Sequence, residues 1–145
     1  MIRVGVQSEP IDVAAALAAV EGDGAGAVAT FTGLVRADDG VAVLELEHYP
    51  GMTEAALEAV AREATDRFAL TAATIIHRVG AMRPGERIVL VATAAPHRSA
   101  ALDACAYLID RLKTDAPFWK RETRADAARW VEARGTDDAA AERWR

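Results

Sequence analysis

Residues 72–95 read AATIIHRVGAMRPGERIVLVATAA and carry the clearest strand signal in the chain. Two apolar runs, Ala72 to Val79 and Arg87 to Ala95, lie on either side of Arg83-Pro84-Gly85-Glu86. Such runs predict buried strands, and a Pro-Gly pair between them predicts a turn. The stretch therefore predicts two consecutive strands joined by a short connection.

Amphipathic helices are predicted on both sides of this pair of strands. Upstream, residues 53–68 place apolar side chains on one helical face, namely Leu57, Val60, Ala61, Ala64 and Phe68. Downstream, Ser99 is a suitable N-cap for a helix that extends to Lys113, and Pro117 ends that helix. The apolar stripe of this second helix consists of Ala101, Cys105, Leu108, Ile109 and Leu112.

The chain before residue 53 is predicted to hold three further strands and one helix. Ile2 to Gln7 alternates as a strand does, and Ser8 is predicted to begin a helix that ends near Val20. The segments 26–32 and 41–49 are predicted to be strands that pair as a hairpin through the turn residues 38–40.

The C-terminal part is predicted to add two short strands, Phe118 to Thr123 and Arg129 to Ala133. The resulting βαββαββαββ order predicts one α+β domain over residues 1–134. The charged, alanine-rich tail, residues 135–145, is expected to be a frayed helix or disordered.

Composition narrows the function classes. The 145 residues carry 17 basic and 22 acidic side chains, a net charge of −5, which disfavours a nucleic-acid binder or a polybasic membrane module. The single cysteine, Cys105, excludes an intrachain disulfide and a cysteine-based metal cluster. Because the sequence shows neither a leader-like N-terminus nor a long apolar span, we expect a cytoplasmic, soluble domain.

Lysine is rare in this chain. Only two of the 17 basic residues are lysines, Lys113 and Lys120, and they are seven positions apart. An arginine is always charged, whereas a lysine amine loses its proton when it is desolvated or crowded by cations. The pair therefore points to an amine that titrates or acts as a nucleophile. The alternative is that two of the 17 cations are lysines close together by chance.

The segment 110–122 is the densest cluster of candidate functional residues. It places four cations and the aromatic pair Phe118-Trp119 around Pro117, a setting that suits a lysine acting as acid, base or nucleophile. The simpler alternative is a helix end whose cations compensate the helix dipole. Scattered histidines without a ligand pattern make a metal site improbable, and His77 in a predicted strand is interpreted as structural.

Two other positions suit an anion. His97-Arg98-Ser99 lies between a strand end and a helix N-terminus, where N–H groups and the helix dipole attract negative charge. Arg36 follows the predicted strand 26–32 and its continuation Gly33-Leu34-Val35. Taken alone, the first position is better explained as a helix cap beside an exposed arginine, and the second as a surface charge.

The ordered motifs resemble the large, catalytic subunit family of molybdopterin synthase over essentially the whole chain. The matching segments are FTGLVR (31–36), LEHYPGM (46–52), IHRVG (76–80), HRS (97–99), LKTDAPFWKRE (112–122) and RWVEAR (129–134). The loop between Arg36 and Val41 is short for this family.

The resemblance implies a sulfur transferase of molybdenum cofactor biosynthesis with an α/β hammerhead-like mixed sheet and an added small β subdomain. It implies conversion of cyclic pyranopterin monophosphate to molybdopterin, with sulfur from the C-terminal Gly-Gly thiocarboxylate of a small ubiquitin-like partner. It further implies a heterotetramer with a self-dimer at its centre, no resident cofactor or metal, and no nucleic-acid or membrane partner.

The resemblance also implies roles for matched residues. Lys113 and Lys120 are expected to be catalytic. The expected substrate-binding residues are Leu34, Val35, Arg36, His97, Arg98, Arg121 and Glu122. Phe31 and Arg134 are expected to support the pocket. Two rivals remain, a non-catalytic subunit that docks a ubiquitin-like protein and an anion-binding α+β domain that takes a nucleotide.

Overall fold

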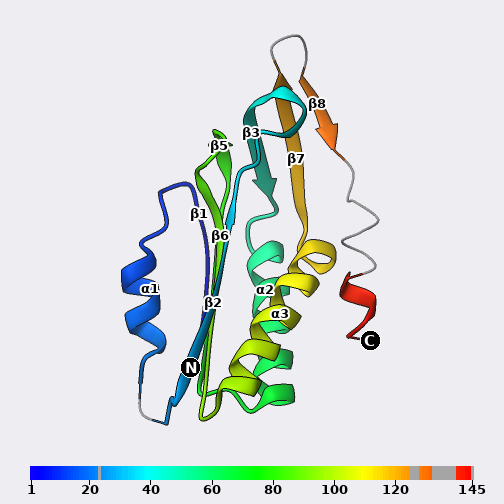
Figure 1. Ribbon diagram of the computed structural model, residues 1–145. Helices are drawn as coiled ribbons and strands as arrows, with labels where there is room; N and C mark the ends of the chain where they lie inside the picture. The colour runs from blue at the N-terminus through cyan, green and yellow to red at the C-terminus, as the bar shows by residue number, and fades with distance from the viewer. Residues whose placement is uncertain (23, 125–127, 132–139, 145) are drawn as a thin grey trace.

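The computed structural model describes residues 1–22, 24–124, 128–131 and 140–144, and it has two sheets (Figure 1). The larger sheet has the strand order β1-β4-β6-β2. Its strands are β1 (Ile2–Gln7), β4 (Ala72–Arg78), β6 (Arg87–Ala95) and β2 (Ala27–Leu34). β1 runs parallel to β4, and the other pairs are antiparallel. The mixed sheet confirms the predicted α+β class.

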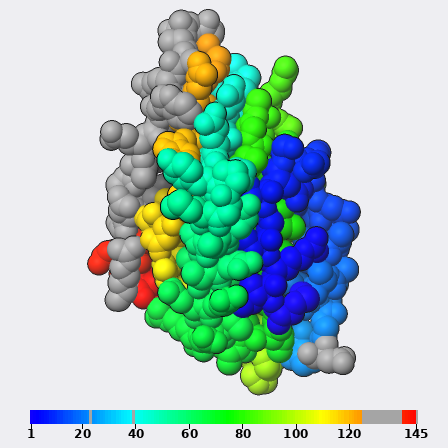
Figure 2. Space-filling view, turned by 180° about the vertical axis from the view of Figure 1, so that it is seen from behind, coloured from blue at the N-terminus to red at the C-terminus, as the bar shows by residue number. Residues whose placement is uncertain are grey.

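Helices cover both faces of the larger sheet (Figure 1). α1 (Val13–Val20) lies on one face, and α2 (Met52–Phe68) and α3 (Arg98–Asp115) lie on the other. The main core forms between α2, α3 and the sheet, with fully buried Leu57, Ile75 and Leu108 among its residues. Figure 2 shows α2 from behind, with β1 along one side of it.

The smaller sheet lies beyond one end of the larger one and has the order β5-β3-β7-β8 (Figure 1). Its strands are β5 (Gly80–Met82), β3 (Val41–His48), β7 (Phe118–Arg124) and β8 (Ala128–Val131). Val35, Leu46 and Met82 form its own small buried cluster. This sheet is the added β subdomain that the family resemblance implied.

Two predicted features of the first 50 residues are wrong. α1 begins at Val13 rather than Ser8, because Asp12 Oδ1 accepts the Ala15 N–H at 3.1 Å and caps the helix there. The predicted hairpin of residues 26–49 does not form, since β2 pairs with β6 while β3 pairs with β5 and β7. Asp38–Gly40 is a short 3-10 turn at the crossing between the two sheets.

Smaller differences concern single elements. β5 was not predicted, because a three-residue strand beside the Pro-Gly turn has no clear pattern of its own. The N-cap of α3 is His97, not Ser99, and no side chain caps that helix end. Of the tail, residues 140–142 form a helical turn in which Ala141 is fully buried, and the prediction for 135–139 falls outside the described residues.

Candidate functional site

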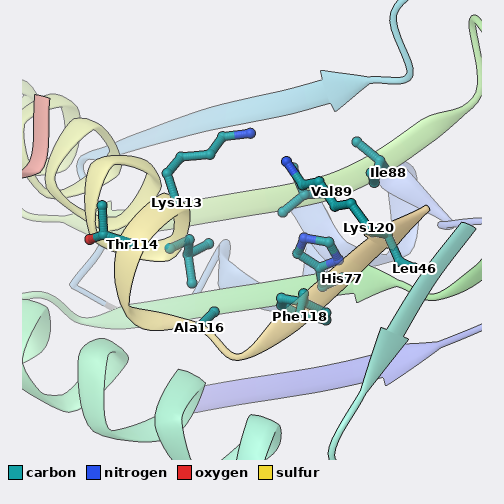
Figure 3. Close-up of a pocket in the computed structure, with 10 residues that line it drawn as sticks. Leu46, His77, Ile88, Val89, Lys113, Thr114, Ala116, Phe118 and Lys120 are labelled. Carbon is teal, nitrogen blue, oxygen red and sulfur yellow. The ribbon is translucent and has the colours of Figure 1, made fainter. Parts of the chain in front are cut away.

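Two lysine side chains from different elements line one pocket. Lys113 lies in the last turn of α3, and Lys120 lies on β7 of the smaller sheet. The pocket has a volume of about 210 Å³, and Figure 3 shows both amine ends extending into it. Its other lining residues are Leu46, His77, Ile88, Val89, Leu112, Thr114, Ala116 and Phe118. None of these ten residues carries a carboxylate, so the lining presents two cations to an anionic ligand.

The turn between α3 and β7 fixes the relation of the two amines. α3 ends at Asp115, and Ala116 has the extended backbone that a residue before proline prefers. The buried Thr53 hydroxyl donates to the Pro117 carbonyl at 2.9 Å and accepts the Tyr49 N–H at 3.0 Å. The start of α2 therefore holds the turn that connects Lys113 to Lys120.

Alternation along β7 decides which of its side chains enter the pocket. Phe118 and Lys120 share one face, and both line the pocket. Arg121 falls on the opposite face and is exposed. Glu122 shares the face of Lys120, but it is ion-paired with Arg124 at 2.9 Å and is not among the lining residues. Within one chain, Arg121 and Glu122 therefore lie outside the lysine pocket.

His77 lies against the inner wall of the pocket, where the sequence interpretation had given it only a structural role. Its ring stacks on Phe118 with centroids 4.0 Å apart and an interplanar angle of 25°. Burial lowers the pKa of His77 to about 4, and the charges of Lys113 and Lys120 act in the same direction. The hydrogen bond to the Arg78 carbonyl opposes this shift.

No local signal in the sequence distinguishes His77 from a structural histidine. The IHR stretch shows only that His77 and Arg78 point to opposite faces of β4. The pocket forms because β4 passes under the α3–β7 turn, and that placement depends on long-range packing.

The predicted residues at the end of β2 do not line the lysine pocket. Val35 is buried in the small cluster with Leu46 and Met82. Leu34 and Phe31 are exposed, and the Arg36 guanidinium is 3.8 Å from the Asp38 carboxylate on the surface. Any substrate contact of these residues therefore lies outside the lysine pocket of the same chain. Their substrate-binding roles stay predictions.

His97 and Arg98 lie at the opposite end of α3 from Lys113. They line a separate, open depression together with Gly26, Ala27, Pro96 and Ser99. Sixteen residues of helix at 1.5 Å each separate His97 from Lys113 by about 24 Å along the axis. One chain alone therefore does not bring this pair to the lysines.

The described part of the chain leaves one predicted site residue out and contains neither a candidate metal site nor a membrane-spanning helix. Arg134 lies outside the described residues. Across 1–22, 24–124, 128–131 and 140–144, no group of three or more His, Cys, Asp or Glu side chains is arranged to hold a metal ion. Among the same residues, no helix has the length and apolar character needed to cross a bilayer.

Comparison with known proteins gives a consistent result. The family described as "MoaE protein" matches residues 6–115. The molybdopterin synthase catalytic subunit of Rhizobium meliloti (strain 1021) is 53% identical, covering 99% of this chain and 96% of its own length. The MoaE protein of Burkholderia ambifaria MC40-6, described as a molybdopterin biosynthesis protein, superposes with a TM-score of 0.86 at 50% identity and covers 99% and 98% of the two chains. Molybdopterin synthase from Staphylococcus aureus superposes with a TM-score of 0.83 at 34% identity, covering 88% and 95%.

Proposed function

The chain belongs to the MoaE protein family, and on this premise we propose that it is the catalytic subunit of a molybdopterin synthase. In this role it converts cyclic pyranopterin monophosphate to molybdopterin in molybdenum cofactor biosynthesis. The sulfur comes from the C-terminal Gly-Gly thiocarboxylate of a small ubiquitin-like partner. The observation that carries the proposal is the meeting of Lys113 and Lys120 in one pocket.

The size of the pocket indicates which part of the reaction it encloses. At about 210 Å³ it is smaller than the 300–1,000 Å³ typical of pockets that enclose a whole small ligand. It suits a narrow peptide end together with the reacting edge of a pterin. Glycines at the partner's C-terminus fit such a channel because they allow close approach of the backbone.

The two amines match the charge changes of sulfur transfer. The thiocarboxylate sulfur bonds to a side-chain carbon of the pterin substrate, and a carbon–oxygen bond at that carbon breaks, so that the cyclic phosphate opens in one round and water leaves in the other. The partner is then joined to the substrate through a thioester. Water then adds to the thioester carbonyl, and collapse of the tetrahedral oxyanion releases the partner's carboxylate and leaves a thiolate on the pterin. A cationic Lys113 stabilises that oxyanion. Lys120 exchanges protons with the leaving oxygen of the cyclic phosphate. Two rounds, each with a fresh partner, install the dithiolene.

A second copy of the chain supplies the remaining cations in this proposal. His97 and Arg98 are suited to bind the substrate phosphate, but they lie about 24 Å from Lys113 along α3. β2 is an edge strand of the larger sheet, and its exposed Phe31 and Leu34 favour contact with another copy. We therefore place the His97-Arg98 pair of one protomer at the lysine pocket of the other. The central dimer, with a small subunit at each end, is the proposed heterotetramer.

The pocket favours an enzyme over the two rival functions. A subunit that only docks a ubiquitin-like protein has no need for two amines facing one partly apolar pocket. A nucleotide-binding domain is expected to use a helix N-terminus, and the described pocket lies at the opposite end of α3. We also propose that the reaction needs no resident cofactor or metal and takes place in the cytoplasm.

The decisive experiment is reconstitution of the reaction. The purified chain is mixed with a thiocarboxylated small subunit and cyclic pyranopterin monophosphate, and molybdopterin is assayed by fluorescence after oxidation. Lys113→Ala is expected to lower turnover at least about 100-fold with the fold intact. Lys113→Arg is expected to fail as well, because the larger planar guanidinium keeps the charge but does not place it where the compact ammonium meets the oxyanion.

Arg62→Ala is the matched control, since Arg62 is an exposed cation on α2 that does not line the pocket. It is expected to keep wild-type turnover. Near-full turnover by Lys113→Arg contradicts the role given to the amine. Absence of molybdopterin from the wild-type mixture contradicts the proposed function itself.

A further inference from the structure

His77 is held in a defined orientation at the inner wall of the lysine pocket. It is the sixth residue of β4, and its ring stacks on Phe118, the first residue of β7 (Figure 3). The stack joins the larger sheet to the smaller one directly beneath the two amines. The imidazole therefore has little freedom to rotate away from the pocket.

A backbone contact fixes the proton of this ring. His77 Nδ1 lies 2.9 Å from the carbonyl oxygen of Arg78. A carbonyl oxygen only accepts hydrogen bonds, so Nδ1 carries the proton and donates it. In the neutral ring this leaves Nε2 as an acceptor with a lone pair.

Burial and the charges around His77 keep the ring neutral. Burial lowers the pKa of the imidazole most, and Lys113 on α3 and Lys120 on β7 lower it further. The neighbouring Arg78 guanidinium lies on the other face of β4, where it donates to the Ser8 carbonyl at 2.8 Å and pairs with Glu86. A third positive charge therefore does not arise in the pocket at neutral pH.

Among the described residues that line the pocket, side-chain acceptors are few. Thr114 Oγ1 is engaged at the helix end, 3.1 Å from the Asp115 carboxylate. The remaining lining side chains are apolar or are the lysines themselves. The imidazole Nε2 is thus the acceptor that the inner wall offers to an ammonium group.

We infer that His77 is a positioning residue whose Nε2 accepts a hydrogen bond from a lysine ammonium in the pocket and aims that amine at the reacting thiocarboxylate. The inference rests on the proposed function for the reaction concerned. In this role His77 orients the amine but transfers no proton and makes no contact of its own with the substrate.

Two substitutions of His77 distinguish the effect of its hydrogen-bond acceptor from the effect of its aromatic ring. His77→Phe keeps an aromatic ring against Phe118 and removes the acceptor. His77→Gln loses the ring but places an amide oxygen near the position of Nε2. His48→Phe is the matched control, since His48 is a partly buried histidine of β3 that does not line the pocket.

NMR tests the inference without any turnover. ¹⁵N-histidine spectra of the wild-type chain are expected to show His77 at pH 7 with its proton on Nδ1. The chain has only two lysines, so ¹³C-lysine labelling gives two side-chain Cε signals. At least one is expected to shift in His77→Phe and to shift less in His77→Gln, while both stay in place in His48→Phe.

Kinetics tests the role in the reconstituted complex. His77→Phe is expected to lower kcat about 10- to 100-fold, the effect of losing one hydrogen bond to a charged group, and to leave KM for the pterin within about threefold. His77→Gln is expected to recover most of the loss. The inference is overturned by wild-type kcat in His77→Phe, by His77→Gln being no better, or by a proton on Nε2.

The two arms keep this inference apart from the proposed function. If the wild-type mixture makes no molybdopterin, the proposed function fails, and the tautomer and lysine signals still decide the hydrogen bond. If His77→Phe does not fold, the wild-type tautomer and the behaviour of His77→Gln decide it.

Discussion

Lysine and arginine carry the same charge, yet only the lysine amine titrates readily when its surroundings change. The scarcity of lysine in the sequence singled out Lys113 and Lys120, and the structure brings both into one pocket. Sequence reasoning did not find His77, because its neighbours in the pocket are remote in the chain. The residue type thus predicted that the two amines belong to the site. The place of the His77 ring beside them became visible only from the packing of β4 against β7.

The partly buried imidazole of His77 also predicts a dependence of stability on pH. Its pKa is about 4 in the folded chain, against 6.5 for an ordinary histidine. Between these values the unfolded chain binds a proton that the folded chain excludes, so the free energy of unfolding falls as the pH drops from 6.5 to 4. This contribution is absent above pH 6.5, where both states are neutral.

Urea unfolding at pH 7 and at pH 4.5 measures this effect. From pH 7 to 4.5 the wild-type chain is expected to lose about 2–3 kcal/mol more than His77→Phe, since carboxylates titrate alike in both proteins. Equal losses in the two proteins contradict a lowered pKa of the His77 imidazole in the folded chain. Arg62→Ala, an exposed substitution on α2, serves as the control and is expected to follow the wild type.

Among the elements, those with a long amphipathic or apolar pattern were predicted well. α2 and α3 and the strands β1, β4 and β6 lie within a few residues of their predicted bounds. The errors concern short or small-residue segments. Ser8 and Pro10 resemble a helix start, but Gln7 donates to the Glu9 and Pro10 carbonyls and keeps this segment outside the helix. The turn residues 38–40 likewise predict a change of chain direction but do not indicate which sheet the next strand joins.

The C-terminal segment is a second case where pattern alone was uninformative. Trp144 packs edge-on against Phe68 and Tyr107, and its indole N–H donates to the Asp110 carboxylate. Arg67 donates to the Trp144 carbonyl at 2.8 Å. These contacts fix residues 140–144 across α2 and α3, far in sequence from both helices.

Trp144→Ala is therefore expected to destabilise the fold by about 1–3 kcal/mol through lost aromatic packing and one hydrogen bond. Urea unfolding followed by circular dichroism measures the change. Turnover of the folded enzyme is expected to stay near the wild-type value, because Trp144 does not line the pocket. Arg143→Ala removes an exposed guanidinium that pairs with Asp110 and lies 4.6 Å from the centre of the Trp144 ring; it is the control and is expected to cost less, because the aromatic packing of Trp144 remains. A stability change in Trp144→Ala no larger than in the control contradicts the packing role.

For the whole molecule, the single chain brings only two of the predicted site residues, Lys113 and Lys120, into one pocket. The lysines lie at one end of α3 and His97-Arg98 at the other. A sequence does not show which protomer contributes each residue to a site. The family resemblance therefore grouped all of these residues into one site without distinguishing the two chains. A site shared between two protomers reconciles the family motifs with the geometry of one chain.

Mixing two inactive variants tests this arrangement. Lys113→Ala and Arg98→Ala are each expected to be impaired alone, and Arg98→Ala is expected to weaken pterin binding more than partner binding. When equal amounts are unfolded and refolded together, half of the dimers are mixed and each mixed dimer keeps one intact site. Activity of about one quarter of wild type is then expected for a two-fold dimer.

The same mixture has a clear contrary outcome. If each pocket uses residues of its own chain only, a mixed dimer holds no intact site and activity stays at the level of the separate variants. The wild-type chain, unfolded and refolded in the same way, is the control for recovery.

The α3–β7 turn places one amine on a helix of the larger sheet and the other on a strand of the smaller sheet. An anion held between them therefore adds a further contact between the two sheets, beside the stack of His77 on Phe118. Loading the pocket should make the layers open as one cooperative unit, so that slow amide exchange in β3 and β7 converges on the rate of β4 and β6. Substrate binding would then be detected as slower amide exchange along the whole of the smaller sheet, beyond the residues that line the pocket.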